Sequence, residues 1–158
     1  MNDVHFHLLT NHFPIIVPII AFLVLVGGFI FRSDMVKKTA LALFIFAAFS
    51  TYIAMVTGDK AEHFAEEIPG ISHDIIHEHE EAAETYALFN YLLGFLSIAG
   101  LWALWKNHRF ANLLTYTILI VGMVSFWFGK QAGTTGGEIR HTEIRGDYVP
   151  SDGDFEKD

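Results

Sequence analysis

The stretch "FPIIVPIIAFLVLVGGFIF", from Phe13 to Phe31, contains no charged side chain. A helix that rises 1.5 Å per residue needs about 20 apolar residues to cross a hydrocarbon core of about 30 Å. This stretch approaches that length. Three others resemble it in length and composition: Thr39–Val56, Thr85–Trp105 and Phe110–Phe128. The sequence therefore predicts an all-α protein whose four helices span a lipid bilayer as an integral membrane bundle.

The composition limits the class of protein further. With 158 residues the chain is one domain by size, and its net charge of −8 is concentrated between the apolar stretches. Because it has no cysteine, disulfides, thiolate metal sites and covalent haem attachment are excluded. No Lys or Arg precedes Arg32, so we interpret the first apolar stretch as a membrane helix, not a cleavable signal. We expect no nucleic-acid partner.

The basic residues predict how the helices are oriented. They gather in the two short connections "RSDMVKK" and "KNHR", whereas the long segment 58–84 holds only Lys60 among its many acidic residues. By the positive-inside rule the short connections are cytoplasmic. Both termini and the acidic segment then lie outside, in the periplasm of a bacterial inner membrane. Eight of the nine histidines fall on that outer side, and only His108 lies inside.

The predicted domain covers residues 1–146, followed by a flexible acidic tail at 147–158. Helix two should end at Gly58 and be followed by an interfacial amphipathic segment at 59–69. Ser72 is a natural N-cap for the third helix, which should extend well beyond the membrane because nothing breaks it before Trp105. The four helices are expected at about 12–31, 38–57, 72–105 and 110–132.

On a helical wheel, the residues of the stretch "SHDIIHEHEEAAE", from Ser72 to Glu84, fall on two opposite faces. His79 shares one face with uncharged residues, among them Tyr86, Asn90 and Ser97, and should point into the bundle. His73 and His77 share the opposite face with carboxylates. That face could bind a metal weakly through His73 and His77, or it could be a solvated acidic collar.

A buried histidine needs a polar partner, because burial of an unpaired polar group costs free energy. His12 opens the first helix at the same membrane boundary as His79. His141 follows Gly133 and Gly137 at spacings of four residues beyond the fourth helix. We expect these three imidazoles to converge at one depth. They could ligate haem b, could hold a zinc, copper or iron ion, or could bind no cofactor and tie the helix ends together by hydrogen bonds.

The motifs "HFPI", "TGDKAEHFAEEIPGISHDIIHEHEEAAE" and "GGEIRH" together resemble a bacterial membrane family of uncharacterised function, the domain-of-unknown-function family 2231, in the form of its Bacteroidetes-like members. The resemblance covers about residues 5–146. It implies a four-helix integral membrane domain, which in this family is sometimes joined to c-type cytochrome modules. It also implies that His12, His79 and His141 are the matching family histidines, and it favours electron transfer.

These observations leave three hypotheses open. The first is a membrane electron-transfer subunit that binds haem b near the periplasmic surface and relays electrons between a quinone or membrane partner and a periplasmic redox protein. Its acidic outer segment would attract a basic cytochrome. The second is a protein that binds divalent metal. The third is a cofactor-free structural subunit of a homo-oligomer or larger membrane complex. No stand-alone catalytic motif is present, so we expect at most a subunit of an oxidoreductase complex.

Overall fold

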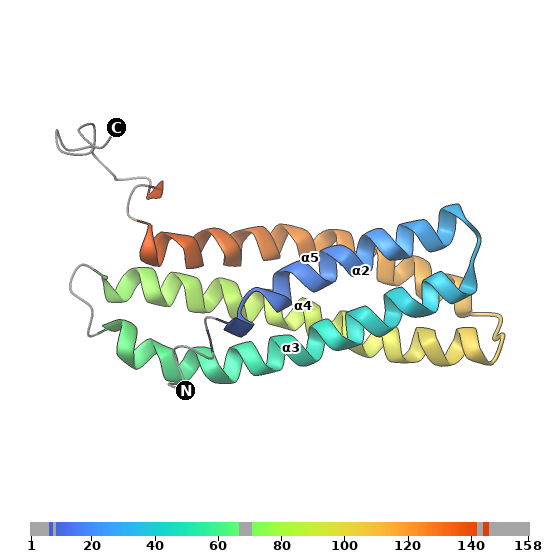
Figure 1. Cartoon of the computed structure of the whole chain (residues 1–158), viewed down its shortest axis with the longest axis horizontal. Coiled ribbons are helices and arrows are strands. Elements are labelled where there is room, and N and C mark those ends of the chain that lie inside the picture. The colour runs from blue at the N-terminus through green and yellow to red at the C-terminus, as the bar shows by residue number, and fades with distance from the viewer. Residues whose placement is uncertain (1–6, 8, 67–70, 142–143, 146–158) are drawn as a thin grey trace.

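The computed structural model describes residues 7, 9–66, 71–141 and 144–145, and its elements carry the labels of Figure 1. Within these residues the chain forms four long helices and no strand, which confirms the predicted all-α bundle. Each of the four is long and apolar enough to cross a membrane. The helices are α2 (Phe13–Ile30), α3 (Asp34–Glu66), α4 (His73–Trp105) and α5 (Ala111–Arg140).

Large apolar side chains cover the outside of the bundle. Each helix presents such residues, with exposed fractions of 62% for Leu23, 61% for Phe49, 71% for Phe95 and 66% for Ile120. In water so much exposed apolar surface would be unfavourable, but in a bilayer it faces lipid tails. The chain is therefore a multi-pass membrane protein whose helices lie in a lipid bilayer.

The helices form a ring in which α3 packs on α2 and α4, α5 packs on α4, and a smaller contact between α2 and α5 closes the ring. We call the end of the bundle at which α4 begins and α5 ends the outer end. There α3, α4 and α5 extend beyond the first residue of α2 (Figure 1). At 1.5 Å per residue the 33 residues of α4 measure about 50 Å, so this helix extends beyond a hydrocarbon core, as predicted.

Two helices are longer than predicted. The expectation that the second helix ends at Gly58 is wrong, because α3 continues to Glu66 and includes residues 59–66 of the predicted interfacial segment. Likewise α5 continues past Ala132 to Arg140. A glycine inside a helix costs only about 1 kcal/mol relative to alanine, and no proline interrupts either extension. The rest of that segment, 67–69, and the tail at 147–158 lie outside the described residues.

The centre of the bundle is closely packed around Leu25, Leu41, Phe44, Leu93 and Ile118, all of which are fully buried. These side chains come from all four helices. Glycine permits the closest approach of two helix backbones.

Gly94 of α4 shows how close that approach is. A Cβ atom at this position would lie 2.5 Å from the Cβ of Ala48 on α3. The contact between α3 and α4 therefore requires a glycine at position 94.

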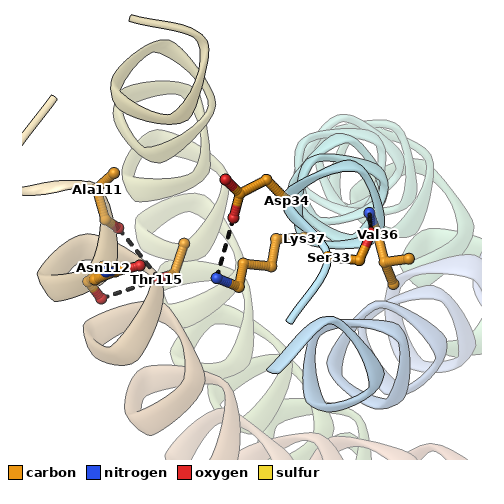
Figure 2. A network of polar contacts seen from close by, with 7 residues as sticks. All are labelled: Ser33, Asp34, Val36, Lys37, Ala111, Asn112 and Thr115. Atoms are coloured by element: carbon orange, nitrogen blue, oxygen red, sulfur yellow. Dashed lines mark hydrogen bonds and ion pairs between the residues drawn. The ribbon is translucent and has the colours of Figure 1, made fainter. Parts of the chain in front are cut away.

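At the opposite end of the bundle, which we call the inner end, side-chain contacts stabilise the first turn of α3. The Ser33 hydroxyl accepts a hydrogen bond from the Val36 N–H at 3.4 Å, and the Lys37 ammonium pairs with the Asp34 carboxylate at 3.2 Å (Figure 2). Lys37 is 7% exposed and lies over the Phe29 ring, 5.1 Å from its centroid. Because a buried cation needs such partners, this turn fixes the connection between α2 and α3.

Candidate functional site

His79 is the inward-facing histidine of α4, as the helical wheel predicted. Its ring is partly buried against α5, with Nδ1 3.1 Å from the Thr135 hydroxyl oxygen. A Cβ atom at Gly136 would lie 2.9 Å from the His79 Cε1, so only glycine leaves room for the ring at this place. The ring also hydrogen-bonds the backbone of Ala132. His79 is therefore held on one turn of α5. We call the three residues that contact its ring, Ala132, Thr135 and Gly136, the seat of His79.

His7 is seated in the same way on α3, although no sequence pattern predicts a role for it. Its Nδ1 lies 3.1 Å from the Thr57 hydroxyl oxygen, and a Cβ atom at Gly58 would lie 3.3 Å from its Cε1. Burial lowers the pKa of His7 from its ordinary value of 6.5, and a hydrogen bond with the backbone of Ala54 partly offsets that effect. The neutral ring is thus the favoured form at neutral pH.

The two seated histidines lie near each other. His7 and His79 are close enough for positive charges on both rings to repel each other. They approach from opposite halves of the chain, one before α2 and the other within α4. At this end α2 starts further in than its neighbours (Figure 1), and His7 lies beside Thr57 of α3. The outer end of the bundle therefore holds two partly buried imidazoles near each other.

Below this pair, a buried polar network joins three helices. Pro18 has no N–H, so the helix leaves the Pro14 carbonyl oxygen without its usual donor. The Tyr86 hydroxyl donates to that oxygen at 2.7 Å and the Asn90 side-chain amide at 3.2 Å. The same amide donates to the Thr51 hydroxyl at 3.0 Å. These bonds fix the height of α2 relative to α3 and α4, and so the level of the histidine pair.

The other predicted ligands lie differently. The side chains of His12 and His141 are both exposed; His12 is the N-cap residue of α2 and His141 the C-cap residue of α5. No contact recorded among the described residues joins His12, His79 and His141. The convergence of these three imidazoles stays a prediction, whereas the structure brings His79 together with His7.

The outer face of α4 is a charged surface. The His77 ring lies 3.4 Å from a Glu80 carboxylate oxygen and 3.5 Å from one of Glu81, and the His73 ring is 6.4 Å from the His77 ring, centroid to centroid. All but the partly exposed Glu80 are exposed. Among the described residues, no group of three or more His, Asp or Glu side chains is arranged to hold a metal ion. The weaker metal site at His73 and His77 stays a prediction.

A groove between α4 and α5 adjoins the site from outside. It measures about 570 Å³ and its lining includes Glu78, Glu81, Glu138 and Lys130. Trp127 and Phe128 form its apolar part, and Thr135 belongs to both the groove and the seat of His79. The outer end thus carries more negative than positive charge next to the histidine pair.

Comparison with known proteins finds no matching family model, no matching curated protein and no matching solved structure. The resemblance to family 2231 therefore stays a prediction.

One sequence signal could have led to His7. A Thr–Gly pair occurs at 57–58 near the predicted end of the second helix and again at 135–136 in "GTTGG". Both pairs prove to be histidine seats. Read alone, each glycine suggests a helix end or a helix contact, and nothing local indicates that His7 lies against α3.

Proposed function

We propose that this protein is a membrane electron-transfer subunit that binds haem b near its outer surface, where His79 and His7 would hold the iron. One observation carries this proposal: two partly buried imidazoles from separate parts of the chain lie near each other at the outer end of the bundle. Haem b supplies a reversible one-electron couple when it is held between such groups.

The residues present fit a haem better than a free ion. A porphyrin provides four of the six iron ligands, so two protein nitrogens complete the set, whereas a structural or catalytic ion usually takes three or four protein donors. The outer core offers two imidazoles. Small and apolar residues at the same level supply walls of low polarity, with exposed fractions of 9% for Ala54, 5% for Ile76 and 5% for Ala132.

The charge at the outer end supports a basic redox partner. Exposed carboxylates of Asp74, Glu78, Glu81 and Glu84 line the first turns of α4. Such a surface speeds the encounter with a positively charged protein, for example a basic periplasmic cytochrome. In this proposal the protein lies in a bacterial inner membrane with its acidic end facing the periplasm. A quinone or a membrane protein supplies the electrons.

The test is optical spectroscopy of the protein purified after expression with added haem precursor. The reduced-minus-oxidised spectrum should show a b-type band that is lost in His79→Ala and His7→Ala. His108→Ala is the matched control, because His108 lies at the inner end, and it should keep the band. Absence of a b-type band from the wild-type protein would overturn the proposal.

The same preparations separate the alternatives. Stoichiometric zinc, copper or iron without haem would indicate an ion site, and His73→Ala/His77→Ala would show whether it lies on the outer face of α4. A cofactor-free protein that co-purifies with fixed membrane neighbours would indicate a structural subunit. His12→Ala and His141→Ala complete the series, because loss of the band in either would return that residue to the ligand set.

A further inference from the structure

The seats of the two histidines have the same sequence pattern, Ala-x-x-Thr-Gly. It reads "AMVTG" at 54–58 on α3 and "AGTTG" at 132–136 on α5. In each seat the threonine hydroxyl lies 3.1 Å from the histidine Nδ1, the glycine lies under the ring Cε1, and the ring donates a hydrogen bond to the alanine backbone. The two helices therefore hold their histidines through the same set of contacts.

The halves of the chain repeat this arrangement. Each half is a hairpin of two antiparallel helices, and its turn contains a residue with positive φ, Arg32 at 51° or Asn107 at 50°. Arg32 lies midway in sequence between His7 and Thr57, and Asn107 lies midway between His79 and Thr135. In the second half both positions lie on helices, and two antiparallel helices of equal rise bring them to the same height; in the first half Thr57 lies on α3 and His7 precedes α2. The bundle thus consists of two similar hairpins, each presenting one seated imidazole.

The threonine hydroxyls determine which nitrogen of each ring carries the proton. Thr57 donates its only hydroxyl proton to its own helix, at 2.9 Å from the Ile53 carbonyl oxygen and 3.1 Å from that of Ala54. Its oxygen can therefore only accept from the histidine, so the Nδ1 of His7 must be the protonated nitrogen.

Thr135 does the same on α5. It donates to the Gln131 carbonyl oxygen at 3.1 Å and to that of Ala132 at 3.3 Å. The Nδ1 of His79 must then also be protonated. In the neutral form of both rings the free lone pair is on Nε2.

We propose that Thr57 and Thr135 are positioning residues that hold His7 and His79 as Nδ1–H tautomers, so that the Nε2 lone pair of each ring is free to bind a ligand. This inference rests on the proposed function for the identity of the ligand, haem iron. Metal-binding histidines usually donate the other ring N–H to a protein oxygen, which fixes ring orientation. Here the two oxygens are those of Thr57 and Thr135.

The first test needs no cofactor. In haem-free protein in detergent at pH 8, with ¹⁵N-labelled histidine, the ring nitrogens of His7 and His79 should give the signature of the Nδ1–H tautomer, assigned with His7→Gln and His79→Gln. Thr57→Val should move only His7 toward the Nε2–H form, and Thr135→Val only His79. Thr57→Ser and Thr135→Ser should keep the Nδ1–H signature of both histidines, because serine retains the hydroxyl.

Thr117→Val is the matched control. Thr117 also donates its hydroxyl to its own helix, at 3.0 Å from the Leu113 carbonyl oxygen, and has no histidine among its recorded partners. The Thr117→Val substitution should change the ¹⁵N ring signals of neither His7 nor His79. A wild-type His7 or His79 in the Nε2–H form, or valine variants whose ring signals match those of the wild type, would overturn the inference.

The second test uses the haem-loaded protein. Loss of such an outer partner weakens metal binding about 10–100-fold, so Thr57→Val and Thr135→Val should each lower haem affinity by that factor while the serine variants retain it. The two proposals fail separately. Correct tautomers without a b-type band would overturn the proposed function alone. A b-type band with the wrong tautomer would overturn the positioning inference alone, whereas a band that survives loss of His7 would contradict both proposals.

Discussion

The hydroxyl of Tyr86 on α4 donates a 2.7 Å hydrogen bond to the carbonyl oxygen of Pro14 on α2. This oxygen is free because Pro18, one turn later, has no N–H to offer it. A proline that would weaken an isolated helix thus creates the acceptor that joins two helices in a bilayer, where unsatisfied backbone groups are costly.

Tyr86→Phe should destabilise the bundle by about 1–2 kcal/mol, since one buried hydrogen bond in a membrane protein is worth about that much. Thermal unfolding in detergent measures the effect. Tyr116→Phe is the control, because Tyr116 is 54% exposed, and it should stay near the wild type.

The dependence on Pro18 gives a sharper test of the same contact. Pro18→Ala restores a backbone N–H that can bond the Pro14 oxygen, so Tyr86→Phe should cost less in that background. A double-mutant cycle should give a coupling of at least about 0.5 kcal/mol. If the two changes are additive, the account of the freed carbonyl is wrong.

A second prediction concerns the glycines under the histidine rings. Gly136→Ala should displace His79 and destabilise the protein by about 1–2 kcal/mol, because the new methyl would lie 2.9 Å from the ring. Gly58→Ala should have a smaller effect on His7, since that distance is 3.3 Å.

Gly27→Ala is the matched control for these glycines. No atom lies within 4 Å of the Cβ position at Gly27, so alanine should be neutral or stabilise α2 by up to about 1 kcal/mol. Unfolding midpoints and the histidine ¹⁵N signals report both effects. Equal results at Gly136 and Gly27 would contradict the seat of His79.

Much of the fold follows from local sequence. The four apolar stretches predicted the helices, and Ser72 proves to be the N-cap of α4, with its hydroxyl 3.4 Å from the Ile75 N–H. The wheel centred on His79 correctly placed Tyr86, Asn90 and Ser97 inside the bundle, since all three are buried. These features depend on period and capping within a single helix, which the sequence displays directly.

The site is less predictable because it depends on contacts between distant segments. His7 and Thr57 belong to different elements, and nothing in the sequence near either residue indicates that they are in contact. Gly58 reads as a helix end when taken alone, yet in the fold it lies inside α3 and makes space for the His7 ring. The acceptor for Tyr86 likewise arises only when α2 lies beside α4.

A third prediction tests the close approach of α3 and α4. Gly94→Ala would place two methyl groups 2.5 Å apart, one of them that of Ala48, so the helices would have to separate. We expect a loss of about 1–3 kcal/mol. Gly94→Ala combined with Ala48→Gly keeps the number of methyl groups in the contact and should recover most of the loss. Thermal unfolding in detergent measures the stability. If the double variant is no more stable than Gly94→Ala alone, the contact between positions 94 and 48 is not the cause of the loss.

A fourth prediction concerns pH. Because the pKa of His7 is lower in the folded protein than its ordinary 6.5, the unfolded chain binds more protons just below pH 6.5. Stability must then fall as the pH is lowered from about 6.5, and the loss is complete only below the lowered pKa. Repulsion between protonated His7 and His79 acts in the same direction.

His7→Gln should flatten this part of the pH profile, since glutamine can still donate to Thr57 but does not titrate. His108→Gln, at the inner end, should leave the slope unchanged. The measurement is the unfolding midpoint between pH 5 and 8. A His7→Gln protein with the full wild-type slope would show that His7 does not contribute.

A fifth prediction tests the orientation that the basic residues indicate. The native chain has no cysteine, so a single introduced thiol reports one position without background. Glu78→Cys places it on the exposed outer end of α4, and Lys106→Cys on the exposed turn between α4 and α5. In intact spheroplasts a membrane-impermeant maleimide should label Glu78→Cys at once and Lys106→Cys only after lysis. The reverse pattern would place the histidine pair on the cytoplasmic side, where a periplasmic redox partner could not reach it.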